Sequence, residues 1–93
     1  MTTIAVKQFC MHYNIPLSFI NTLSSFELIE LIEVENSKHL QLDDIQKIEK
    51  MMRLHYDLNV NFESLDIINR LTSQINSLQE ELNELKNKID FYR

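Results

Sequence analysis

The chain has 93 residues, 44% of them hydrophobic and 25% charged, which is enough for one small domain and an extension. Its formal net charge of −5 argues against attraction to nucleic acid or to an anionic membrane through the overall field. The single cysteine excludes an internal disulfide and fits a reducing cytoplasm, and we expect no signal peptide and no membrane span.

The first part of the chain predicts two short helices. Residues 2–6 form a lead-in, and a helix is expected at 6–13. Its inward face holds Val6, Phe9, Cys10 and Tyr13. Asn14-Ile15-Pro16 predicts a turn, because a residue before proline is pushed out of the helical region. A second helix follows at 16–23, and its inward residues are Phe19, Ile20 and Leu23. Two short helices joined by a tight turn predict a helix-turn-helix-like unit.

Residues 28–42 have a different pattern. Residues 28–34 are rich in β-branched side chains and partly alternate, residues 35–38 form a turn cluster, and residues 39–42 alternate again. This pattern predicts a short β-hairpin, or wing. An extension of the preceding helix over residues 27–32 is the alternative interpretation.

A third helix is expected at 43–56. Asp43 and Asp44 stand where negative charge favours a helix start. Its apolar stripe comprises Ile45, Ile48, Met52 and either His55 or Tyr56. Residues 57–61 predict a break, after which Asn61 or Glu63-Ser64 starts the final helix.

The final helix carries a regular heptad pattern. Apolar residues alternate steps of three and four along it, at Ile68, Leu71, Ile75, Leu78, Leu82, Leu85, Ile89 and Tyr92. Ile68 and Ile75 exemplify the a positions, and Leu71 and Leu78 the d positions. So narrow a stripe predicts a coiled-coil dimer, because the preceding residues are too few to cover it. The heptad pattern does not determine whether the two helices of the coiled coil run parallel or antiparallel.

The sequence contains no recognisable motif for catalysis or metal binding. The three histidines, His12, His39 and His55, fall on separate elements without metal-ligand spacing. Cys10 lies on an apolar face, where a cysteine is usually a small core residue. The absence of glycine removes the usual phosphate-cradling loop. We therefore expect neither an enzyme nor a bound cofactor or metal.

Helix-turn-helix architecture raises DNA binding as an alternative. The second helix contains no Lys or Arg, and residues 1–42 hold only Lys7 and Lys38 as fixed cations. Asn21 and Thr22 could read a base edge. Phosphate contacts need cations, however, so nucleic acid is not the expected partner.

The order of features resembles the MerR-like fold, and its detail resembles the CbpM-type chaperone modulators, a subgroup of that superfamily. The resemblance covers nearly the whole chain. The similar stretches are Val6-Lys7-Gln8-Phe9-Cys10, Asn14-Ile15, Leu28-Ile29-Glu30, Leu42-Asp43-Asp44-Ile45, Met52-Arg53-Leu54, Leu58-Asn59-Val60-Asn61 and Ile67-Ile68 with the helix that follows. The resemblance implies a mainly α fold: a winged helix-turn-helix domain at 1–60, with a small β-hairpin wing, and a long coiled-coil dimerisation helix at 61–93. The Arg and Tyr residues of MerR-type activators are missing from the second helix and wing.

The resemblance also implies a function. Members of the subgroup bind the J-domain of a CbpA/DnaJ-like co-chaperone and restrain its activity. They are not enzymes and carry no cofactor. A J-domain presents a basic helix, which an acidic homodimer suits. The candidate contact residues are Glu27, Glu30, Glu33, Glu35, Asp43, Asp44 and Glu49. A DNA-binding regulator and a coiled-coil dimer with no further partner are the alternatives.

Overall fold

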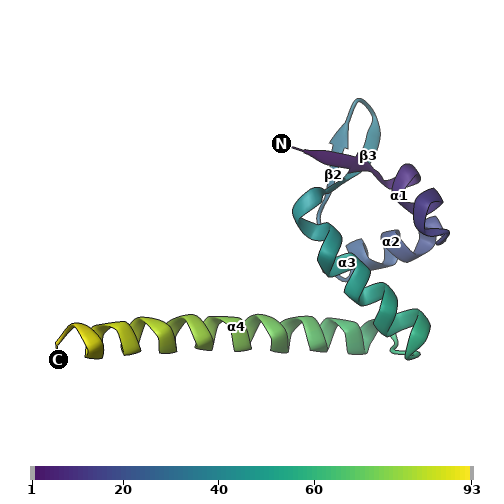
Figure 1. The fold of residues 1–93 in the computed structure, drawn as a ribbon. Helices are drawn as coiled ribbons and strands as arrows, with labels where there is room; N and C mark the ends of the chain where they lie inside the picture. Colours follow the sequence, from purple (N-terminus) through teal and green to yellow (C-terminus); the bar gives the residue numbers. More distant parts are fainter. Residues whose placement is uncertain (1, 93) are drawn as a thin grey trace.

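The computed structural model describes residues 2–92 and contains a small α/β domain followed by one long helix (Figure 1). The elements are β1 (Thr3–Ala5), α1 (Val6–Tyr13), α2 (Leu17–Ser25), β2 (Leu31–Val34), β3 (Ser37–Gln41), the 3₁₀ turn η1 (Leu42–Asp44), α3 (Ile45–Met52), the π-helical turn η2 (Arg53–Asp57) and α4 (Phe62–Phe91). The predicted mainly α fold with a hairpin wing and a long C-terminal helix is confirmed.

Two left-handed residues end the first two helices. Asn14, with φ 55°, follows α1, and the Ile15 N–H donates to the Cys10 carbonyl at 3.0 Å. Glu27, with φ 59°, follows α2, and the Leu28 N–H donates to the Leu23 carbonyl at 3.0 Å. In both cases the residue after the left-handed one donates to a carbonyl five residues earlier, as in a Schellman motif. The alternative of a helix over residues 27–32 is therefore wrong, because the chain reverses at Glu27.

A three-stranded antiparallel sheet, ordered β1-β3-β2, forms the wing and its base. β2 and β3 are joined by Glu35 and Asn36, whose φ values of 50° and 64° are both positive, as a type I′ hairpin turn requires. Thr3, in the expected lead-in, pairs with Gln41. The sequence pattern did not predict this strand within the lead-in, because its three residues gain their ladder bonds only from the distant β3.

The third helix covers the expected residues in three geometries: η1, α3 and η2. Ile48 and Met51 are its buried residues, while Met52 is partly exposed. Ile45 and Met52 of the predicted stripe are partly buried and pack against the core, which confirms the prediction at these two positions. The stripe did not include Met51. The π turn positions His55, whose Nδ1 lies 2.8 Å from the Val60 carbonyl oxygen.

The core draws side chains from every layer of the domain. Those less than 2% exposed are Phe9, Ile20, Leu23, Leu28, Leu40, Ile48 and Leu65. Only Leu65 comes from α4, among the residues that the structure describes. Phe62 adds an aromatic contact, with its ring centroid 4.5 Å from that of His55 and 5.8 Å from that of Phe19. The start of α4 is thus part of the domain.

Beyond this anchor, α4 extends past the domain (Figure 1). Asn61 caps it: its side-chain oxygen accepts a hydrogen bond from the Ser64 N–H at 2.8 Å. This confirms the helix start predicted at Asn61. No helix within residues 2–92 is long and apolar enough to cross a membrane.

Candidate protein-interaction surfaces

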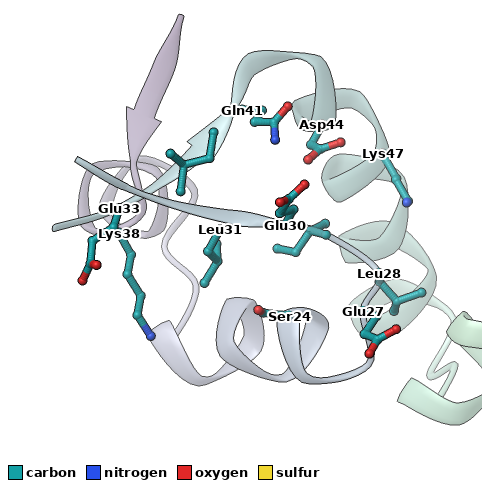
Figure 2. A pocket seen from close by; sticks show the side chains of 12 residues that line it. Ser24, Glu27, Leu28, Glu30, Leu31, Glu33, Lys38, Gln41, Asp44 and Lys47 are labelled. Carbon is teal, nitrogen blue, oxygen red and sulfur yellow. The ribbon is translucent and has the colours of Figure 1, made fainter. Parts of the chain in front are cut away.

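A cleft of about 730 Å³ lies beside the wing, where the chain runs from the end of α2 into β2 (Figure 2). We call it the wing cleft. Its lining residues are Ser24, Glu27, Leu28, Ile29, Glu30, Leu31, Ile32, Glu33, Lys38, Gln41, Asp44 and Lys47. Every residue from Glu27 to Glu33 contributes. The cleft follows this segment because the left-handed turn at Glu27 sends the chain along the edge of the sheet.

The wing cleft combines an apolar part with a mainly acidic rim. Leu28 and Ile29 are buried, whereas Leu31 and Ile32 remain partly exposed. Four of the seven predicted contact carboxylates line it: Glu27, Glu30, Glu33 and Asp44. Two cations, Lys38 and Lys47, also line it, and Lys38 is directly opposite Glu33 across the β-ladder. Negative charge therefore exceeds positive charge around an apolar surface.

The other three predicted carboxylates lie elsewhere. Glu35 is at the hairpin tip, and exposed Asp43 is in η1 without lining the wing cleft. Glu49 is on α3, where the Tyr13 hydroxyl donates to its Oε2 at 3.0 Å. Glu49 thus has a structural partner. The sequence did not reveal this contact, because Tyr13 and Glu49 are 36 residues apart.

The pKa of three groups in the domain is raised. For Tyr13, the hydrogen bond to Glu49 is the main cause of the raised pKa, with burial and the Glu49 charge adding to it. Burial raises the pKa of the Cys10 thiol, and burial followed by the charge of Cys10 raises that of Tyr56. A raised pKa keeps the Cys10 thiol protonated, which opposes nucleophilic chemistry. Within residues 2–92, no group of three His, Cys, Asp or Glu side chains is arranged to hold a metal ion.

The exposed face of α2 is neutral. Leu17, Ser18 and Asn21 are exposed, and the helix carries no Lys or Arg. The Thr22 hydroxyl donates to the Ser18 carbonyl at 2.8 Å, so it is engaged within the helix. This face offers polar groups without the positive charge that phosphate contacts require.

The predicted dimerisation residues form an exposed stripe along α4, which we call the α4 stripe. Leu71, Ile75, Leu78, Leu82, Leu85 and Ile89 are 51–64% exposed. The two end members differ. Ile68 is partly buried and lines a groove against α3, and Tyr92 lies just beyond the last residue of α4. The side chains in between are not covered by their own domain.

A helix-turn-helix followed by a β-hairpin and a long helix is the arrangement of a winged helix-turn-helix protein. A family model described as "MerR HTH family regulatory protein" matches residues 4–87. The chain belongs to this family, and its general kind is regulatory. Neither the curated proteins nor the solved structures searched contain a significant match.

Proposed function

We propose that the protein is a homodimeric modulator that binds and restrains the J-domain of a CbpA/DnaJ-like co-chaperone. In this proposal, residues 1–60 form the partner-binding domain, whose core Leu65 completes, and residues 61–93 form the dimerisation helix. The observation that carries it is the wing cleft, where four carboxylates and two lysines border a partly apolar surface. A basic helix with apolar side chains would find complementary charge and contact area there.

Membership of a regulatory helix-turn-helix family supports the proposal in general terms. The uncharged α2 supports it more specifically, because a DNA-binding helix without cations has little to hold it on phosphate. The α4 stripe supports the dimeric form, since a row of exposed Leu and Ile at heptad spacing is suited to a second copy.

Titration calorimetry at low salt, with the J-domain of the organism's own co-chaperone, tests the proposal. The double variant Glu30→Lys, Glu33→Lys should weaken binding by at least about tenfold, because it reverses two rim charges. The control variant Glu80→Lys, Asp90→Lys makes the same change in net charge on exposed positions of α4 outside the α4 stripe. It should bind normally. No binding by the wild-type protein, or equal weakening by both variants, would contradict the proposal.

The restraining activity needs a separate competition experiment. The wild-type protein should displace an Hsp70 partner from the J-domain, and the Glu30→Lys, Glu33→Lys variant should do so poorly. Simultaneous binding of both proteins to the J-domain would show that the wing cleft does not cover the Hsp70-binding surface.

A DNA-binding transcriptional regulator is the second candidate, and the family match favours it. It predicts a mobility shift with duplex DNA that weakens steeply as salt increases. We expect no shift at low salt with random or operator-like duplexes. A salt-sensitive shift that is lost on substituting Asn21→Ala would favour the regulator instead.

A further inference from the structure

A second groove, of about 590 Å³, separates α3 and η2 from the first half of α4. We call it the α3–α4 groove. It is distinct from the wing cleft, although Lys47 borders both. The proposed function does not use it.

The charge of this groove is opposite to that of the whole chain. Lys47, Lys50 and Arg53 line its α3 side at intervals of three residues. Glu49 is the one carboxylate of its lining, and it accepts the Tyr13 hydrogen bond. Three cations therefore stand against one anion in a protein whose net charge is −5. An anionic ligand is complementary to this surface.

The rest of the groove defines the ligand further. Met51 and Leu65 are buried at its base, and Leu54 and Ile68 are partly exposed beside them. The α4 side contributes neutral polar groups, exemplified by Asn69. An apolar base between a cationic side and a neutral polar side fits a ligand that is apolar on one face and acidic on another.

The dimensions fit a helix. The α4 side extends from Leu65 to Asn76, which corresponds to about 16 Å at about 1.5 Å per residue. This is about three helical turns. We propose that the α3–α4 groove binds an acidic amphipathic helix of a partner protein, with its apolar face on Met51, Leu54 and Ile68 and its carboxylates near Lys50 and Arg53.

Nucleic acid fits the same groove less well. No aromatic side chain is among the lining residues, so bases would have no stacking platform. The apolar base would remain unmatched by phosphate and sugar. Apolar contact is instead what an amphipathic helix offers.

A labelled synthetic peptide with leucine at helical spacing and glutamate between, about fifteen residues long, is the probe. Fluorescence anisotropy at low salt should show saturable binding that salt weakens. A matched peptide with serine in place of leucine should bind at least about tenfold more weakly, because it cannot use the apolar base. Saturable binding of both peptides with equal affinity, or of neither, would overturn the proposal.

Two variants locate the binding. The double variant Lys50→Glu, Arg53→Glu should bind the leucine-containing peptide at least about tenfold more weakly than the wild-type protein does. The control Lys7→Glu, Lys86→Glu makes the same charge change at exposed positions outside both grooves, and its affinity for the peptide should stay within about twofold of the wild-type value. Asn69→Trp fills the groove without changing charge and should also weaken binding, which provides a test if the double variant fails to fold. Equal weakening by the control, or full affinity in Asn69→Trp, would overturn the proposal.

Two competitors complete the test. Displacement of the peptide by a single-stranded oligonucleotide at equal concentration would overturn the proposal in favour of nucleic acid. Loss of peptide binding as the protein concentration increases would overturn it in favour of a second copy of the chain. Peptide binding unaffected by either is the expected result.

Discussion

The N-terminal domain and the C-terminal helix differ in the burial of their apolar side chains. The domain, up to Leu65, encloses a core of large apolar residues from three helices, the sheet and the start of α4. The rest of α4 displays a row of Leu and Ile side chains that are more than half exposed. Full burial of one such side chain contributes about 1.5–3 kcal/mol. The domain can therefore obtain its stability from its own core, whereas we propose that α4 obtains much of its stability from a second chain.

The largest expected effect comes from breaking the α4 stripe. Leu78→Asp with Leu82→Asp would place four carboxylates in a symmetric dimer interface, so self-association should weaken by more than about a thousandfold. Sedimentation equilibrium measures this. The control Ser77→Asp, Asn83→Asp adds the same charge on exposed positions outside the stripe and should remain associated. A dimer that survives the Leu substitutions would mean that another surface joins the chains.

A core substitution should act on the other region. Leu40 is fully buried in β3, so Leu40→Ala should lower the free energy of unfolding of the domain by about 2–5 kcal/mol. Exposed Leu58 is the control, and Leu58→Ala should change stability by less than about 0.5 kcal/mol. Denaturant unfolding in the background of the monomeric α4 variant gives both values. Equal losses would contradict the core assignment.

Alkaline pH should weaken the domain through Tyr13. Its pKa is raised, chiefly by the hydrogen bond to Glu49, so the folded state holds the phenolic proton more tightly than the unfolded state. This stabilisation is fully present below the ordinary tyrosine value of about 10 and is lost as pH rises through the folded-state value. Thermal midpoints of Tyr13→Phe should therefore decline less above about pH 10 than those of the wild type. Identical declines would show that the contact with Glu49 does not stabilise the domain.

The smallest effect concerns the left-handed residue that turns the chain into the wing cleft. Glycine adopts positive φ without the steric cost that Glu27 bears, so Glu27→Gly should stabilise the domain by about 0.5–1 kcal/mol. Asn14→Gly is the comparison and should gain less, because asparagine tolerates this conformation better. Destabilisation by Glu27→Gly would indicate that its side chain contributes a contact in the cleft.

Local patterns predicted most of the fold. The spacing of Val6, Phe9 and Cys10 placed α1 at its observed bounds, and the alternation around the turn placed the hairpin. Asn61 capped α4 as its residue type suggested. Two features were not predicted, because one depends on a distant contact and the other is a rare backbone geometry. β1 forms only against β3, and the π turn at Arg53–Asp57 displaces the helical pattern on which periodicity relies.

The candidate sites were harder to predict from the sequence than the fold was. The acidic residues near the wing were recognisable, but the cleft selects four of them and leaves Glu35, Asp43 and Glu49 outside. The α3–α4 groove was missed entirely. It arises where the start of α4 packs against η2, which places Lys50, Arg53 and Asn69 in the lining of one groove. The spacing of the cations was the signal available in the sequence.

Sedimentation equilibrium of the wild-type protein over a range of concentrations tests most directly whether the α4 stripe joins two chains. The mass should increase with concentration from the 11.1 kDa of one chain toward twice that value. A mass that stays at 11.1 kDa at every concentration would contradict the division between a self-sufficient domain and a helix completed by its partner.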